Sequence, residues 1–184
     1  MLPGDWQTDA MRYQRVTPES LDAALYARCC QFDVVDLAIG MREVPSLDYL
    51  RHHLFERQTL ALYQLWPTAM AAPCGVGVLS LYTSQVTTGA CLDGGWRDDW
   101  TVAVLADLAA AAFAMEPAHA LLWTHLAQPE PATAPPLMVG LGYELGARNL
   151  GLEAAPCASY LLHREIFALY RGAAARPDDD DDDD

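Results

Sequence analysis

Histidines and cysteines have the most versatile side-chain chemistry in this 184-residue chain, since both bind metal ions and both take part in catalysis. His119 and His125 share one strand-like segment, but no third ligand stands near them, so their spacing predicts no metal site. The odd number of cysteines fits neither a disulfide framework nor a zinc motif. We therefore expect reduced, mostly buried thiols at all five positions, which are Cys29, Cys30, Cys74, Cys91 and Cys157.

The chain is strongly acidic. It has 25 Asp and Glu residues against 11 basic residues, all of them Arg, which gives a net charge of −14. Such a charge repels phosphate backbones and argues against direct binding of nucleic acid. The run Asp178–Asp184 supplies seven of these charges and is expected to be a solvated, disordered tail. The tail is interpreted either as a solubility device or as a segment that docks on a basic partner.

Segments that would direct the chain to a membrane are not evident. No apolar run reaches the roughly 20 residues of a membrane helix, and residues 1–11 lack the basic cluster of a secretory signal. We therefore expect a cytoplasmic protein without a membrane span.

Apolar spacing predicts a mixed α/β domain in the order β-α-α-β-β-β-α-β-α-β. Thr17 and Pro18 open the first predicted helix, and Ser46 caps the second. A long buried helix, Trp100–Met115, stands between two apolar strands and predicts a βαβ crossover, with the other strands antiparallel. The strands are predicted over 11–16, 59–66, 75–82, 84–92, 118–126 and 157–166, and a short helix over 137–141.

This order divides the chain into three parts. We expect an N-terminal extension over residues 1–10, one domain over 11–171 and an acidic tail over 172–184.

Over residues 12–166 the order of elements resembles that of the GCN5-related N-acetyltransferases. The most specific piece is Leu137–Tyr143, which is similar to the family's "L-Y-x-x-L-G-F" segment before the last strands. The resemblance implies a mostly antiparallel sheet flanked by helices and a cofactor, acetyl-CoA, whose pyrophosphate lies at the start of the long helix.

The residues that the resemblance assigns to this chemistry are altered. The stretch that matches the phosphate loop reads Arg97, Asp98, Asp99, Trp100, Thr101 and Val102. Arg97 fits the pattern, but Trp100 and Val102 stand where the small residues belong, and Asp98 and Asp99 add two negative charges beside the phosphate site. Met138 stands at the position of the tyrosine that protonates the leaving thiolate, and Gln128 replaces a frequent asparagine. Glu144, Tyr143 and Tyr160 are the remaining candidates for an acid or a base. We therefore expect no cofactor, with acetyl-CoA as the alternative.

A narrower resemblance concerns residues 55–145. The run from Thr59 through Cys74 to Val86, followed by the strand with Trp123, is similar to the acetyltransferase-like internal virion protein of podophages. The other interpretation of the same residues is an unrelated acetyltransferase with a degenerate site. A phage origin would place the chain in a virion, with other virion proteins as its partners.

Three functions remain open at this point. The first is a non-catalytic structural or interaction protein on an acetyltransferase-like scaffold, because the phosphate loop and the tyrosine are changed. The alternative is an N-acyltransferase with an unusual acetyl-CoA site. The third is a toxin, antitoxin or immunity partner, in which an acidic face binds a basic protein.

Overall fold

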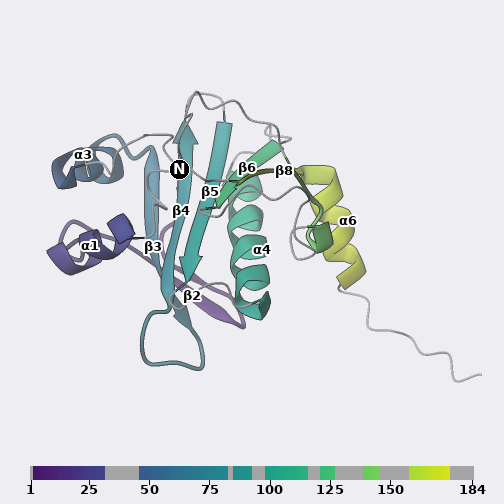
Figure 1. Cartoon of the computed structure of the whole chain (residues 1–184), viewed down its shortest axis with the longest axis horizontal. Helices are drawn as coiled ribbons and strands as arrows, with labels where there is room; N and C mark the ends of the chain where they lie inside the picture. Colours follow the sequence, from purple (N-terminus) through teal and green to yellow (C-terminus); the bar gives the residue numbers. More distant parts are fainter. Residues whose placement is uncertain are drawn as a thin grey trace, which may run out of the picture.

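The computed structural model is a single sheet covered by helices on both faces (Figure 1). It describes residues 2–31, 46–82, 85–92, 98–115, 121–126, 139–145 and 158–174. Within these ranges the strands pair in the order β1-β2-β3-β4-β5-β6-β8-β7. Their bounds are β1 Trp6–Gln7, β2 Met11–Arg15, β3 Leu60–Pro67, β4 Gly75–Tyr82, β5 Gln85–Leu92, β6 Leu121–Leu126, β7 Tyr143–Leu145 and β8 Ala158–His163.

The sheet is antiparallel except at one place. β5 and β6 run parallel as neighbours, and the helix α4 (Asp98–Met115) connects them. The other neighbouring pairs among the described strands are antiparallel. The predicted fold class and the βαβ crossover are therefore confirmed.

Helices lie on opposite faces of this sheet (Figure 1). On one face are α1 (Ala23–Gln31) and α3 (Leu47–Arg51), and α3 continues directly into the π-helical turn η1 (His52–Glu56). On the other face are α4 and α6 (Arg164–Ala174). α6 contacts α4 through Arg164, which donates to the Phe113 carbonyl at 2.7 Å, and through Phe167, whose ring lies 5.7 Å from that of Phe113.

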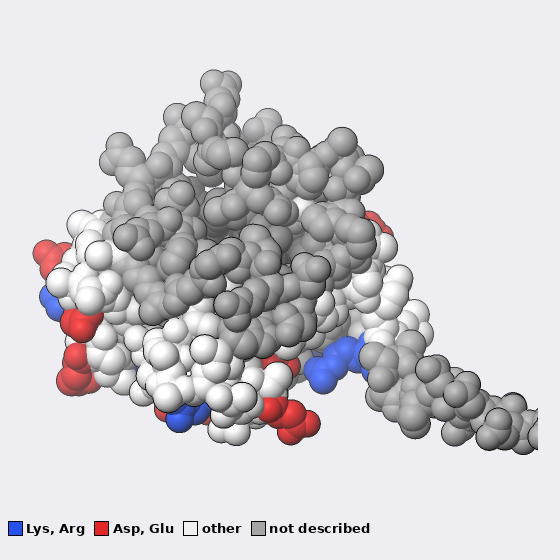
Figure 2. Space-filling model, turned by 60° about the horizontal axis from the view of Figure 1, so that its bottom comes forward, with Lys and Arg blue, Asp and Glu red and all other residues white. Residues whose placement is uncertain are grey.

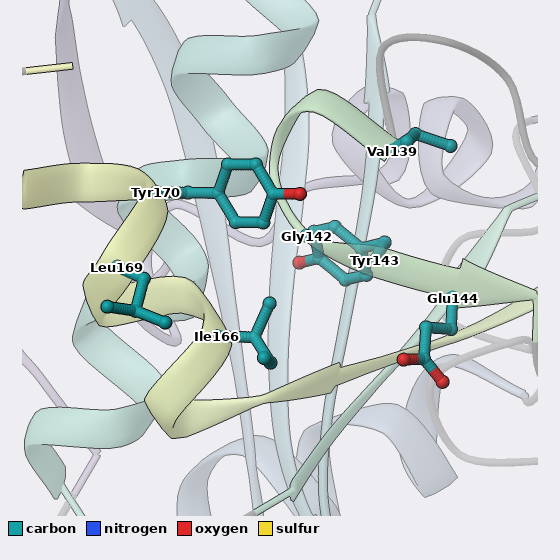
Figure 3. Close-up of a pocket in the computed structure, with 7 residues that line it drawn as sticks. All are labelled: Val139, Gly142, Tyr143, Glu144, Ile166, Leu169 and Tyr170. Carbon is teal, nitrogen blue, oxygen red and sulfur yellow. The ribbon is translucent and has the colours of Figure 1, made fainter. Parts of the chain in front are cut away.

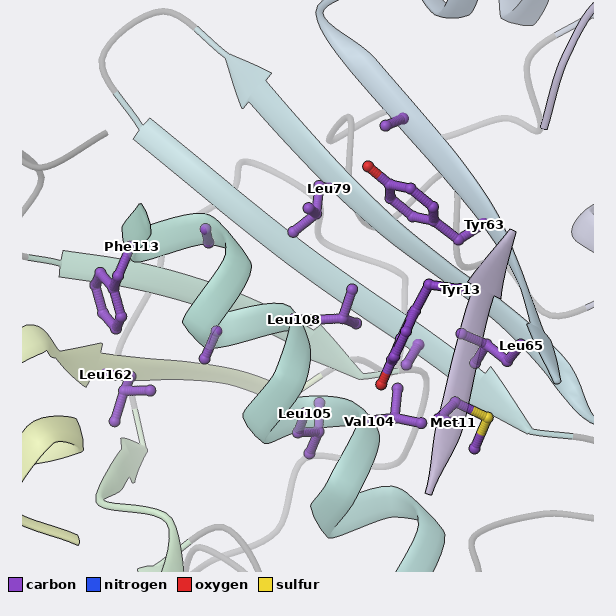
Figure 4. Close-up of a cluster of buried hydrophobic side chains, with 14 of the residues drawn as sticks. Met11, Tyr13, Tyr63, Leu65, Leu79, Val104, Leu105, Leu108, Phe113 and Leu162 are labelled. Carbon is purple, nitrogen blue, oxygen red and sulfur yellow. The ribbon is translucent and has the colours of Figure 1, made fainter. Parts of the chain in front are cut away.

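Alternation along the central strands explains why both faces are covered. Leu60 and Leu62 of β3 pack with the α1 and α3 side chains, whereas Tyr63 and Leu65 pack with α4. Because successive strand residues point to opposite faces, an apolar strand of this kind needs helices on both sides. Figure 4 shows the α4 side, where Leu105 and Leu108 project from the helix toward the strands.

Element boundaries differ from the predicted ones at both ends of the domain. The first helix begins at Ala23 rather than at Thr17, because Asp22 Oδ1 accepts a 2.7 Å hydrogen bond from the Leu25 amide and caps it. Thr17 instead closes a turn with Ser20. The last strand ends at His163, not at 166, and α6 follows it at once.

Two short strands were not predicted, and one predicted helix is described only in part. β1 pairs with β2, and β7 pairs with β8 at the edge of the sheet. Of the helix predicted over 137–141, residues 139 and 140 are helical and 141 and 142 form a turn. Leu2 is buried, and Trp6 packs against the core, so part of the expected N-terminal extension contributes to the domain. The division of the chain at residues 10 and 171 stays a prediction.

Charged groups are scattered over the surface that can be described. On the face in Figure 2, acidic and basic groups lie close to one another among uncharged atoms, and the described part of that face has no broad patch of one sign. In the described helices no segment has the length and apolarity needed to cross a membrane. The acidic run Asp178–Asp184 lies outside the described residues.

Candidate functional site

The sheet opens between the carboxyl ends of β5 and β6. The parallel register joins Val86 to Leu122 and ends where Thr88 meets Thr124. β5 nevertheless continues to Leu92 and β6 to Leu126, so the two strands no longer pair with each other beyond Thr88 and Thr124. Ligands of sheets with crossover helices bind outside the carboxyl ends of such strands. This opening, together with the start of α4, is the candidate site.

The first turn of α4 borders the opening and contains most of the predicted phosphate-binding stretch. α4 begins at Asp98, so Asp98, Asp99, Trp100 and Thr101 provide the free backbone amides of its amino end. Val102 follows and is half-buried. Arg97 lies outside the described residues. The backbone favours an anion here, but the two carboxylates of the same turn oppose it.

Of the predicted acid and base candidates, Tyr160 is nearest to the opening. Tyr160 pairs with Thr124 of β6, which in turn pairs with Thr88, so all three stand in one row across the sheet at the last parallel rung. At about 4.8 Å per strand, Tyr160 is about 10 Å from Thr88. Its side chain is fully buried under α4. The sequence alone could not reveal this row, because it depends on the pairing of distant strands.

Tyr143 and Glu144 lie farther away, on the edge strand β7. Tyr143 is 3% exposed and belongs to the α4-side core, whereas Glu144 is exposed. β7 is three strands from β5, about 14 Å across the sheet, so neither residue borders the opening. Met138 and Gln128 lie outside the described residues.

A groove of about 520 Å³ separates β7 from α6 (Figure 3). Gly142 has a φ of +85° there, and a Cβ on it would stand 2.7 Å from both Ile166 Cγ2 and Tyr170 Cδ2. The glycine of the Leu-Gly-Tyr segment therefore allows both the turn into β7 and the close approach of α6. The α6 side of this groove was not predicted from the sequence, although the spacing of Ile166 and Tyr170 by four residues is a helical signal.

A histidine pair occupies the π-helical turn η1 on the opposite face of the sheet. His52 Nδ1 lies 2.7 Å from Glu56 Oε2, and His53 Nδ1 lies 3.1 Å from Thr59 Oγ1. Burial lowers the pKa of His53 below its ordinary value, and the neighbouring His52 and Arg57 lower it further. The folded protein therefore favours neutral His53.

This pKa shift predicts a loss of stability in acid. Because unfolded His53 binds its proton more tightly than folded His53, the free energy of unfolding should fall as the pH drops below about 6.5. Urea unfolding at about pH 7.5 and about pH 5.5 measures the difference. His53→Gln can keep the hydrogen bond to Thr59 and should reduce the difference in unfolding free energy between the two pH values. His163→Gln, at an exposed site on β8, is the control and should leave that difference unchanged. An unchanged pH dependence in His53→Gln would contradict this assignment.

Of the comparisons with known proteins, the one with solved structures finds similar proteins. No protein-family model matches the chain, and no curated protein matches it in sequence. Among solved structures, it is similar to the spermidine/spermine N-acetyltransferase SpeG from Vibrio cholerae, in mutant forms, at 10% identity, a TM-score of 0.64 and coverage of 90% of this chain and 99% of that one. It is also similar to an acetyltransferase from Agrobacterium tumefaciens, at 12% identity, a TM-score of 0.57 and coverage of 88% and 95%. A third is RimJ from Mycobacterium smegmatis in complex with CoA-disulfide, at 16% identity, a TM-score of 0.55 and coverage of 90% of each chain.

These structures correct the expectation that no cofactor is involved. RimJ holds CoA-disulfide, and a spermidine N-acetyltransferase from Vibrio cholerae with the same fold holds CoA and spermine. Coenzyme A is therefore a ligand of proteins with this fold, and the expectation of none was wrong. The neighbours named here are acetyltransferases. The link to a phage virion protein stays a prediction. The chain has the fold of the GCN5-related N-acetyltransferases.

Proposed function

We propose that this chain is an acetyl-CoA-dependent N-acyltransferase with an altered phosphate subsite. The observation that carries the proposal is the opening of the sheet after Thr88 and Thr124, beside the first turn of α4. The fold and its acetyltransferase neighbours support the same activity.

The opening fits the extended part of such a cofactor. The first two β5 residues beyond the last parallel rung, Gly89 and Ala90, are small, so a ligand can approach the strand backbone closely. When bound there, acetyl-CoA would supply an activated acetyl thioester. The backbone amides at the start of α4 would hold its phosphates.

Proton transfer needs a donor other than the residue at position 138. An acyltransferase of this kind needs a donor for the departing thiolate, and methionine at position 138 cannot donate. Tyr160 is the phenol that stands in the row of the last rung. We assign it the proton-donating role.

Removing the two carboxylates at the start of α4 should strengthen acetyl-CoA binding. Each would repel the cofactor phosphates by on the order of 1 kcal/mol, so removing both charges in Asp98→Asn/Asp99→Asn should tighten acetyl-CoA binding about thirtyfold. Isothermal titration measures the change. Because exposed charges are screened, the gain should shrink at high salt. Asp48→Asn, in the first turn of α3, is the matched control and should leave the affinity unchanged.

A blocking variant locates the binding site. Tryptophan at Gly89 would stand beside the opening, so Gly89→Trp should weaken acetyl-CoA binding by about tenfold or more while circular dichroism confirms the fold. Release of free thiol in the presence of a panel of amines then tests turnover. If the wild-type protein binds no acetyl-CoA at concentrations up to about 1 mM, the proposed function fails.

A further inference from the structure

A second groove lies on the outer side of α4, away from the opening of the sheet. Five α4 residues line it at helical spacing, so they form one stripe, and they are Asp107, Ala110, Ala111, Ala114 and Met115. From Asp107 to Met115 the stripe is about 12 Å long. The N-terminal segment and α6 provide the walls, and the groove encloses about 530 Å³. This volume is within the range of about 300–1,000 Å³ that is typical of small-molecule sites.

Asp107 is the only ionisable residue of α4 beyond its first turn, and the structure fixes its orientation. Its Oδ2 accepts a 2.9 Å hydrogen bond from Thr8 Oγ1 and another of 2.9 Å from the Tyr13 hydroxyl. Figure 4 shows the Tyr13 hydroxyl pointing to α4. Burial raises the pKa of Tyr13, and the nearby Asp107 raises it further, so the phenol stays protonated and keeps donating. Asp107 thus lines the groove with a carboxylate whose orientation is fixed by hydrogen bonds.

Trp6 is the aromatic residue that lines this groove, and its ring packs on two buried tyrosines. Trp6 stacks on Tyr13 with ring centroids 4.2 Å apart and meets the edge of Tyr63 at 4.6 Å. The Tyr63 hydroxyl donates to the Pro3 carbonyl at 2.8 Å, which ties the N-terminal segment to the sheet. Such a wall binds apolar or aromatic groups at little cost in conformational entropy.

Arg171 of α6 brings the opposite charge to the same groove. Its guanidinium lies 5.8 Å from the Phe167 ring and is exposed. Arg171 and Asp107 both line this groove, so one ligand can meet a positive and a negative group there. A guanidinium binds a carboxylate with two parallel hydrogen bonds, and a carboxylate binds an ammonium group.

We propose that this groove binds a free α-amino acid with an aromatic or large apolar side chain. Asp107 receives the ammonium group, Arg171 receives the carboxylate, and Trp6 with the alanine stripe holds the side chain. The site is separate from the acyl-transfer opening, and it requires neither acetyl-CoA nor turnover.

The experiment titrates L-phenylalanine into the full chain without acetyl-CoA. Two analogues each lack one charge: phenethylamine has no carboxylate and 3-phenylpropionate has no ammonium group. L-Phenylalanine should bind more tightly than either by about tenfold, which is 1.4 kcal/mol. Methyl NMR signals of Ala110, Ala111 and Ala114 should shift on binding, which locates the ligand independently of any enzymatic activity.

Two variants assign the contacts. Asp107→Asn keeps an oxygen that accepts from Thr8 and Tyr13 but removes the negative charge. Arg171→Gln removes the positive charge of an exposed side chain, so this variant tests the site even if Asp107→Asn folds poorly. Each should weaken L-phenylalanine binding about tenfold, and Arg171→Gln should leave phenethylamine binding unchanged. Asp48→Asn and Arg57→Gln are the matched surface controls. Phenethylamine binding as tight as L-phenylalanine, no binding up to about 10 mM, or full affinity in both variants would each overturn the proposal.

Discussion

Gly142→Ala is expected to destabilise the protein by about 2–4 kcal/mol, because the change adds both backbone strain and a steric clash. With φ at +85°, an L-residue with a Cβ is unfavourable at this position. The same Cβ would stand 2.7 Å from Ile166 Cγ2 and from Tyr170 Cδ2, closer than carbon atoms approach in folded proteins. Urea unfolding should therefore show a lower midpoint with an unchanged slope.

Gly77→Ala is the matched control for this prediction. Gly77 is also buried, but a Cβ there meets only the flexible ends of Leu65 at 3.2 Å and Leu108 at 3.5 Å. Its cost should be less than about 1.5 kcal/mol. In a double-mutant cycle, Tyr170→Ala should relieve part of the Gly142→Ala penalty, since it removes one of the clashing groups. Equal losses in the two glycine variants would show that α6 does not pack on this turn.

The long elements of the fold could be predicted from the sequence because their patterns are local. Strand β4 was predicted over its observed length, 75–82, from a continuous apolar run between Pro73 and the following polar residues. The α4 prediction was two residues short at its start, since aspartates are common both at a cap and in the first turn. The Ser46 cap of α3 is confirmed, and its side chain accepts from the Tyr49 amide.

The short elements could not be predicted in the same way. β1 has two residues and β7 has three, too few for an alternating pattern to be recognised. α6 was missed because its apolar residues Ile166 and Phe167 continue directly from the apolar strand β8. The change from strand to helix at His163 and Arg164 is marked by neither glycine nor proline.

The resemblance to acetyltransferases located the candidate site in the sequence, whereas the pairing of the strands determined which candidate residue lies beside it. Residues 98–102 of the altered stretch lie in the first turns of α4, as predicted, but their conflict with phosphate binding led to the wrong expectation of no cofactor. Three candidate acids and bases had equal standing in the sequence. The register of β6 with β8 separates them, since only Tyr160 falls in the row of the last parallel rung. Such a row is a property of distant strands and leaves no local signal.

Leu108→Ala is expected to cost about 2–5 kcal/mol, because the truncation leaves a cavity between α4 and the sheet. Leu108 is fully buried and projects from α4 (Figure 4). Its methyl groups lie over Gly77 of β4, where the absence of a side chain lets the helix approach the strand. Leu169→Ala is the control, since Leu169 of α6 is 70% exposed and its loss should change stability by less than about 0.5 kcal/mol. Urea unfolding measures both.

The same variant tests whether the packing of α4 also determines the shape of the opening. α4 links the two strands that separate after Thr88, and its first turn borders the gap between them. If its packing on β4 holds that turn in place, folded Leu108→Ala should bind acetyl-CoA more weakly than the wild type under conditions where both are fully folded. Equal affinity would mean that the cavity relaxes locally and that the opening is maintained by the strands themselves. Equal destabilisation by Leu108→Ala and Leu169→Ala would contradict the packing of α4 described here.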